Sequence, residues 1–280
     1  MVQVELQALR EWIGRTQRAV DLVTPRLVAS LRATLDGSVV DDKTDAQYIP
    51  QCIHWCLTPQ LTPATELDAD GHGARGGFMP PVPLPRRMWA GGEVVFHDSL
   101  RLGDEVARTS RIEDVQLKSG ATGTLCFVTV RHEVSTPRGL AVSERQDIVF
   151  RELEVRPNTA VNIASDAPQW RRQVRCDPIM LFRYSALTFN SHRIHYDVDY
   201  CREQESYPGL LVHGPLQASL LLEFAAAIRG RHAPRSFVFR CTSALFAGSA
   251  QLGANESPAG LQLTVADEQD RQTMTATASW

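Results

Sequence analysis

Apolar residues recur along the chain at two different periods, and the change of period divides the first half into a helical and a stranded part. Helical spacing before residue 58 predicts helices over 6–13, 24–35 and 45–57, the second with Pro25 at its start. After Gly92 the period falls to two, which is typical of strands. Four long antiparallel strands are predicted over 93–97, 105–117, 125–135 and 140–151.

The second half repeats this plan. Asp177 and Pro178 have the residue types of an N-cap and a first helical position, so they predict a helix that runs to about Leu187. A second helix is predicted from Gly214, and its apolar stretch 216–228 is typical of a buried core helix. Strands are predicted over 236–246, 261–266 and 272–280. A polar stretch, 158–168, is the predicted linker between the halves.

These two units of helix on antiparallel sheet predict an α+β fold that arose by duplication and divergence. The predicted domains are 1–157 and 158–280, and a chain of 280 residues is comfortable for two cores. Between the first helices and the strands lies a Pro- and Gly-rich stretch, 58–92. A loop this long in a folded domain is usually functional or covers a neighbouring element.

Composition narrows the classes of function. Hydrophobic residues make up 43% and charged residues 22% of the chain, which is typical of a globular protein. The net charge of −3 and the lack of a basic run argue against a nucleic-acid or membrane-surface binder. No window approaches the roughly 18 apolar residues of a membrane span, and the start does not resemble a secretory signal.

The six cysteines predict reduced thiols in the cytoplasm rather than a disulfide framework. Cys52 and Cys56 lie four apart on a predicted helix, but a metal site would need a second pair of ligands at matching spacing. They are interpreted as small buried hydrophobic residues, and no metal is predicted.

The candidate chemistry is concentrated in two segments of the second half. Residues 188–197 read Thr-Phe-Asn-Ser-His-Arg-Ile-His-Tyr-Asp, and residues 207–215 read Tyr-Pro-Gly-Leu-Leu-Val-His-Gly-Pro. Histidine is the side chain best suited to exchange protons near neutral pH. The backbone N–H of Gly214 lies at the start of a predicted helix, where unpaired amides and the helix dipole favour negative charge.

Both segments resemble the hydratase motif of the MaoC-like enoyl-CoA hydratases, usually spelled Asp-x-Asn-Pro-x-His. The match places His195 on the motif histidine, Asn190 on the aspartate, His192 on the asparagine and Arg193 on the proline. This spelling is most similar to the branch of the type 2 3-hydroxyacyl-thioester dehydratases and the itaconyl-CoA and mesaconyl-C4-CoA hydratases. Segments 75–78, 83–92 and 103–106 resemble the amino-terminal domain of that branch.

The resemblance implies a double-hotdog fold whose first domain is catalytically degenerate. Hydration of an unsaturated thioester needs a held water, a proton-transfer group and donors for the enolate oxygen. His195 is the implied base, Asn190 can hold water but cannot titrate, and Gly214 N–H is the implied donor. The missing carboxylate leaves open whether His192 or Asp197 supplies a second proton-transfer or orienting role.

Each of these residues also has a structural interpretation. Asn190 and the His213-Gly214 pair can serve as loop or capping residues, and Asp197 is interpreted as an orienting or N-capping group rather than an acid. The phosphates of coenzyme A favour Arg and Lys, and a free substrate carboxylate favours Arg, although a solvated surface role is the default for any one arginine. The predicted substrate-binding residues are Arg86, Arg87, Arg183, Arg193, Tyr196 and His213.

The predicted function is that of a cytoplasmic hydro-lyase that converts itaconyl-CoA or mesaconyl-C4-CoA to citramalyl-CoA. Alternatives are a 3-hydroxyacyl-thioester dehydratase of fatty-acid metabolism, a hotdog thioesterase and a non-catalytic thioester-binding protein. The acyl-CoA is the expected partner, and no cofactor is expected. Two hotdog domains already form the paired unit of the fold, and a homodimer is the alternative assembly.

Overall fold

The computed structural model describes residues 5–35, 48–120, 123–152 and 167–280 of the chain. Within these residues the strands form one ten-stranded antiparallel sheet in the order β1-β3-β4-β5-β2-β7-β10-β9-β8-β6. The strands are β1 Thr16–Leu22, β2 Arg86–Phe96, β3 Glu105–Gly120, β4 Gly123–Thr136, β5 Gly139–Arg151, β6 Trp170–Cys176, β7 Ser236–Cys241, β8 Gly248–Ser257, β9 Gly260–Ala266 and β10 Gln272–Ser279.

The helices accompany this sheet. They are α1 Leu6–Arg10, α2 Pro25–Leu35, α3 Pro178–Thr188, α4 Val198–Glu203 and α5 Gly214–Ile228, with 3-10 turns η1 Gln51–Cys56, η2 Ala64–Glu66 and η3 Arg193–His195. None of the helices in the described ranges has the length and apolar character needed to cross a bilayer.

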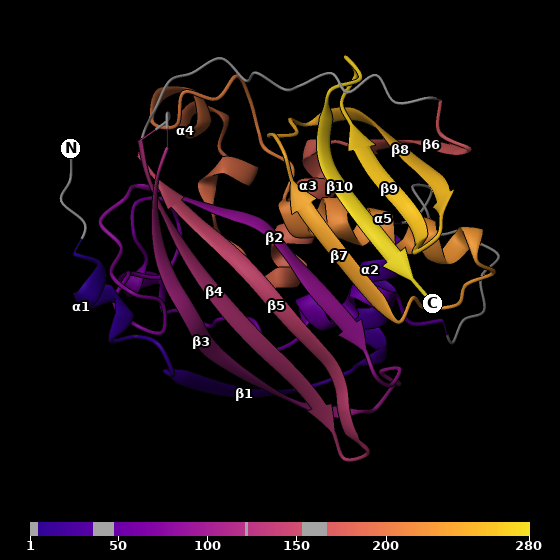
Figure 1. Cartoon of the computed structure of the whole chain (residues 1–280), viewed down its shortest axis with the longest axis horizontal. Helices are drawn as coiled ribbons and strands as arrows, with labels where there is room; N and C mark the ends of the chain where they lie inside the picture. Colours follow the sequence, from indigo (N-terminus) through magenta and orange to yellow (C-terminus); the bar gives the residue numbers. More distant parts are fainter. Residues whose placement is uncertain (1–4, 36–47, 121–122, 153–166) are drawn as a thin grey trace.

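The sheet has two halves that meet at a single pair of strands. Strands β1 to β5 come from the first half of the chain, β6 to β10 come from the second, and β2 pairs with β7 between them. Figure 1 shows the two sets of strands on opposite sides of the molecule, with α2, α3 and α5 behind the strands of the second half. The predicted boundary at 157–158 lies outside the described residues.

Helix α5 is the centre of the main core. Most of its residues are apolar, with no polar face, which is typical of a fully buried helix, and every residue from Leu216 to Ala226 is buried. It packs against β7 to β10, β2 and η1, so it contacts elements from both halves. The main core accordingly combines buried residues from both halves of the chain.

The Pro- and Gly-rich stretch covers one end of the first-half sheet. Val82 and Leu84 are fully buried in a second core cluster together with residues of β3, β4 and β5. The Arg75 guanidinium fixes this segment by donating hydrogen bonds of 2.7, 2.6 and 2.8 Å to the carbonyls of Val82, Leu84 and Pro85. Of the two roles expected for a long loop, covering a neighbouring element is confirmed for 78–85.

Several predicted elements are confirmed, with their signals. Helices α2, α3 and α5 begin where the caps and prolines place them, and the Asp177 carboxylate accepts a hydrogen bond of 2.9 Å from Met180 N–H. The Asp197 side chain accepts one of 3.0 Å from Tyr200 N–H, so its interpretation as an N-cap is also confirmed. The four long strands of the first half are present as β2 to β5.

Other predictions were wrong. The predicted third helix is the 3-10 turn η1 over its described part, and the first helix ends at Arg10 instead of Ile13. Strands β1, β6 and β8 and helix α4 were missed. β1 is an edge strand without a buried residue, so it lacks the apolar alternation that marks a strand, and β8 is built mainly of small and polar residues.

Gly92 lies where β2 pairs with β7, and the backbone is closely packed at this position. A Cβ there would collide with the carbonyl oxygen of Arg145 and lie 2.9 Å from Phe239 Cζ. We expect Gly92→Ala to lower the free energy of unfolding by about 1–3 kcal/mol, because overpacking forces the backbone to shift. Thermal unfolding followed by circular dichroism measures this. Gly209→Ala, with open space at its Cβ, is the control, and equal melting temperatures for the two variants would contradict the prediction.

Candidate functional site

Four histidines from three segments of the chain meet beside the start of α5. His195 lies at the end of η3, and its ring stacks on that of His213 with centroids 3.6 Å apart and planes 20° apart. The His192 ring lies 5.5 Å from His195, edge to face, and the His72 ring lies 4.1 Å from His192. Three of these rings belong to the two predicted motif segments, whereas His72 comes from the first half of the chain.

One hydrogen bond defines the tautomer of His195. Its Nδ1 lies 2.8 Å from the carbonyl oxygen of Leu211. A carbonyl only accepts, so Nδ1 carries the hydrogen and Nε2 has the lone pair. Burial lowers the pKa of His195 to about 4, which keeps the ring neutral near pH 7. Nε2 of His195 can therefore accept a proton.

His213 lies beneath His195 and is 1% exposed. Its Nε2 lies 2.8 Å from the Ser185 hydroxyl on α3. Burial, and then the nearby His195 and His192, lowers the pKa of His213 well below the usual range. The structure thus places His213, a predicted substrate-binding residue, where its neutral ring packs against the His195 ring.

Gly214 is the first residue of α5 and follows His213 directly. A Cβ at this position would lie 2.8 Å from Cε3 of Trp89, which comes from β2. The absence of a side chain therefore lets an indole from the first half pack against the start of the helix. The first-turn N–H groups of α5 remain at the site with the positive end of the helix dipole.

Asn190 shapes the loop that carries His192. Phe189 ends α3 in the left-handed region, with φ 50°, and Asn190 N–H then donates 2.9 Å to Ser185 O. The Asn190 side-chain oxygen accepts 3.0 Å from His192 N–H. Among the described residues no group accepts from its amide NH2, which leaves that group available to hold a water. The side-chain oxygen of Asn190 thus makes the expected capping contact, while its NH2 group has no acceptor in the described ranges.

The prediction missed a carboxylate at this site. The Asp70 carboxylate lies 3.0 Å from Nδ1 of His72 and also accepts 2.8 Å from His72 N–H. Burial alone would raise the pKa of Asp70, but the hydrogen bond and charge of His72 hold it well below its usual range. The Asp-Gly-His sequence in a Gly-rich loop was the available signal.

Asp70 and His72 reach the site because their loop is tied to the motif loop by backbone contacts. Arg193 N–H donates 2.9 Å to Asp70 O, and the Ser191 hydroxyl donates 2.5 Å to Gly71 O. Gly71 has φ +89°, and a Cβ there would collide with the Ser191 carbonyl. Only glycine fits such a position easily. Gly71 therefore allows the loop that carries Asp70 and His72 to pack closely against the motif loop.

The donor atoms of Asp70, His72 and His192 lie within 4.8 Å of one another, the one such group of three or more in the described ranges. Metal binding would require the Asp70 oxygen and a nitrogen from each ring. The 3.0 Å hydrogen bond already joins the Asp70 oxygen to His72 Nδ1. The geometry is that of a hydrogen-bonded carboxylate–imidazole pair.

Two of the predicted substrate arginines are held in ion pairs. Arg86 is buried, with its Nε 3.0 Å from a Glu205 carboxylate oxygen and its guanidinium over the Tyr207 ring. Arg193 binds Asp197 at 2.8 and 3.0 Å and donates 3.1 Å to Ala69 O. Both fix the loops around the site.

Tyr196 is half-exposed, and its hydroxyl donates 3.0 Å to Ser191 O on the same loop. Its predicted contact with substrate stays a prediction.

Arg87 is the arginine that lies at the histidine cluster without an ion pair among the described residues. Its charge acts on both His72 and His192. Burial lowers the pKa of Arg87 to about 10, so it remains a cation. A half-buried guanidinium whose donors have no partner in the described ranges is suited to a carboxylate or phosphate group.

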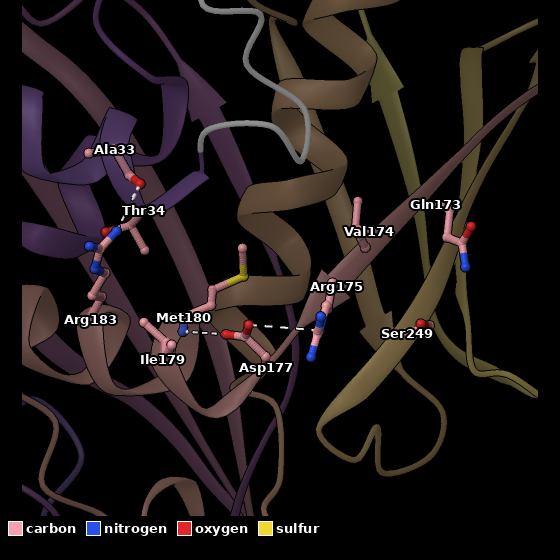
Figure 2. Close-up of a pocket in the computed structure, with 10 residues that line it drawn as sticks. All are labelled: Ala33, Thr34, Gln173, Val174, Arg175, Asp177, Ile179, Met180, Arg183 and Ser249. Atoms are coloured by element: carbon pink, nitrogen blue, oxygen red, sulfur yellow. Dashed lines mark hydrogen bonds and ion pairs between the residues drawn. The ribbon is translucent and has the colours of Figure 1, made fainter.

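Arg183 lies at a different place. It lines an open cavity of about 580 Å³ at the start of α3, where it donates 3.3 Å to Ala33 O (Figure 2). The motif loop follows the other end of this eleven-residue helix, five residues after Arg183, which is about 8 Å along the axis at 1.5 Å per residue. Its predicted contact with substrate stays a prediction.

Comparison with known proteins gives a family match. Residues 51–247 match the family model described as hydroxyacyl-thioester dehydratase type 2. The chain is 42% identical over 240 residues to mesaconyl-C(4)-CoA hydratase of Chloroflexus aurantiacus, and the alignment covers 84% of each protein. The family-model match spans both motif segments and the Asp70 loop.

Solved structures share the fold. A protein described as a MaoC-like dehydratase superposes with a TM-score of 0.69 at 14% identity, covering 98% of this chain and all of that one. A Mycobacterium tuberculosis protein described as a double hotdog has a TM-score of 0.56 at 14% identity, with 94% of each chain covered. The predicted double-hotdog fold is confirmed.

Because His195 is buried in its neutral form, we predict that the free energy of unfolding falls in acid. The unfolded chain takes up this proton near pH 6.5, whereas the folded chain does so only near pH 4. Stability is therefore complete above about pH 6.5 and falls as the pH approaches 4. Between pH 6.5 and 4, we expect the free energy of unfolding of wild type to fall more steeply with decreasing pH than that of His195→Gln. The two slopes should differ by about 1.4 kcal/mol per pH unit. Urea unfolding at pH 8, 6 and 5 measures the difference, and equal slopes would contradict it.

Proposed function

The chain belongs to the hydroxyacyl-thioester dehydratase type 2 family, whose chemistry is that of a hydro-lyase, and we propose that it hydrates mesaconyl-C4-CoA to citramalyl-CoA. The observation that carries this proposal is the neutral His195, with its Nε2 lone pair free, beside the first turn of α5. The 42% identity to a mesaconyl-C(4)-CoA hydratase supports this substrate.

In this proposal His195 activates the water. A water held by the Asn190 amide gives its proton to His195 Nε2 as its oxygen attacks the β-carbon of the thioester. The Nδ1–H bond to Leu211 and the stack on His213 orient the ring during this transfer. General base catalysis by a positioned histidine typically contributes 10²–10⁴-fold to a rate.

The enolate oxygen that forms needs hydrogen-bond donors. The first-turn N–H groups of α5, beginning at Gly214, supply them together with the helix dipole. Preorganised backbone donors of this kind stabilise developing charge by roughly 3–4 kcal/mol in acyl-transfer enzymes. Because Trp89 packs on Gly214, the first half of the chain fixes one wall of the acyl site.

Arg87 supports a substrate with a free carboxylate. Mesaconyl-C4-CoA carries one on its acyl group, and Arg87 provides a cation close to His72 and His192. Itaconyl-CoA, another C5 dicarboxylic thioester, is proposed as the second candidate substrate on the same ground.

The second candidate function is dehydration of 3-hydroxyacyl thioesters in fatty-acid metabolism. The family description favours it, and the same residues would carry the reaction in reverse. A thioesterase or a non-catalytic binder is less well supported, because the Nε2 lone pair of His195 and the free Asn190 amide suit water addition at the β-carbon.

Adding water changes no oxidation state, so the proposed reaction needs no redox cofactor. Six free cysteines, five of them buried, support a reducing compartment such as the cytoplasm. A homodimer stays a prediction that light scattering would test.

The reaction itself is tested with a panel of mesaconyl-C4-, itaconyl- and crotonyl-CoA. We expect loss of enoyl absorbance without release of free thiol, fastest with a dicarboxylic thioester, and a loss of at least 100-fold in kcat for His195→Gln. Preference for crotonyl-CoA would favour the fatty-acid alternative. Thiol release from saturated and unsaturated thioesters alike would contradict hydration.

The carboxylate receptor is tested by Arg87→Met, with Arg87→Lys as the variant that keeps the charge. Loss of a hydrogen bond to a charged group costs about 1.5–3 kcal/mol, so kcat/KM for mesaconyl-C4-CoA should fall about 10- to 150-fold in Arg87→Met. Crotonyl-CoA has no carboxylate and should be affected far less. An equal loss for both substrates would show that Arg87 serves the part of the thioester that they share.

A further inference from the structure

Hydration involves two proton transfers, and the two motif segments provide no free carboxylate for the second one. Hydration removes a proton from water and delivers one to the α-carbon. His195 fits the first step, but Asn190 stands where the family motif has its aspartate and cannot titrate. Asp197, the nearest motif carboxylate in sequence, is used by the α4 cap and by Arg193.

We propose that the first half of the chain supplies this group, with His72 as the catalytic acid–base residue at the α-carbon and Asp70 as its positioning residue. The inference rests on the proposed function and deepens it. It means that the first hotdog, although it lacks the motif, contributes half of the acid–base machinery.

Geometry places the pair in the same site as His195. The His72 ring is 4.1 Å from that of His192, which in turn lies 5.5 Å from His195. Nδ1–H of His72 donates to the Asp70 carboxylate at 3.0 Å, so Nε2 is the ring nitrogen left for chemistry. A carboxylate that orients an imidazole in this way fixes its tautomer and stabilises its protonated form.

The position of the pair is set by the motif loop. Arg193 holds Asp70 O through its backbone N–H and Ala69 O through Nη1. The Ser191 hydroxyl holds Gly71 O. These contacts tie the backbone of residues 69–71 to Ser191 and Arg193, the two neighbours of His192 in sequence, so the three imidazoles keep a fixed spacing.

The proton balance closes within the cluster. In hydration the water O–H bond breaks, its proton goes to His195 Nε2, and its oxygen bonds to the β-carbon. The electron pair of the C=C bond moves to form the enolate, and the α-carbon takes a proton from Nε2 of protonated His72. His192, whose ring lies between the other two, returns a proton from His195 to His72. One water is consumed, and the cluster regains its starting protonation.

The charges around His72 come from several segments. Asp70 faces it from its own loop, Arg75 from the same stretch, Arg87 from β2 and His192 from the motif loop. Burial lowers the pKa of His72, and Arg87 and Arg75 add to this, while the hydrogen bond and charge of Asp70 oppose it. Without Asp70 the protonated form of His72 would lose the one anionic group in this set.

The pH dependence of kcat/KM for hydration separates this role from a structural one. In wild type the alkaline limb reports loss of the His72 proton. We expect Asp70→Asn to move that limb to lower pH by about one unit or more, because an opposite charge is removed, and Asp70→Glu to move it back. We expect His72→Gln to lower kcat by 10²-fold or more without a matching rise in KM.

Ser191→Ala is the matched control, since it weakens docking of the loop and removes no titratable group. It should lower the rate at every pH without moving the limb, and circular dichroism confirms that each variant is folded. An Asp70→Asn limb that stays in place, or a rate lost on dialysis against a chelator, would overturn the proposal. Wild type that hydrates no enoyl-CoA would instead overturn the proposed function.

Discussion

The site depends on one buried contact, the stack of His195 on His213 beside the start of α5. Two imidazoles 3.6 Å apart cannot both be protonated, because like charges at this distance in a buried site repel strongly. Burial lowers the pKa of both rings. The fold thereby keeps the Nε2 lone pair of His195 available, at the cost of stability in acid.

This contact in turn requires both halves of the chain. The β2–β7 pairing makes one continuous sheet, and it brings Trp89 of the first half onto Gly214 of the second. The long loop of the first half then closes over the motif loop through contacts that only Gly71 permits. The double-hotdog fold thus has two halves of unequal sequence, of which one carries the motif and the other completes its surroundings.

Much of this could be predicted from the sequence because strong local signals agree with the final fold. Asp177 and Pro178 start α3, the largely apolar α5 is buried, and the motif placed His195 and His192 together. The rest depends on contacts between distant segments. Asp70 lies 120 residues or more from the motif. Nothing local distinguishes Arg86, which is paired with Glu205, from Arg87, which has no ion pair in the part of the chain that the structure describes. Edge strand β1 has no buried residue, so its pattern carries no strand signal.

A crystal structure of His195→Gln with citramalyl-CoA bound tests the central claim most directly. The account predicts the β-hydroxyl next to residue 195 and the Asn190 amide, the thioester oxygen at the first turn of α5, and the free carboxylate at Arg87. His72 Nε2 should face the α-carbon. An acyl group bound instead in the cavity at the start of α3, with Arg183, or a His72 turned away from the α-carbon, would contradict it.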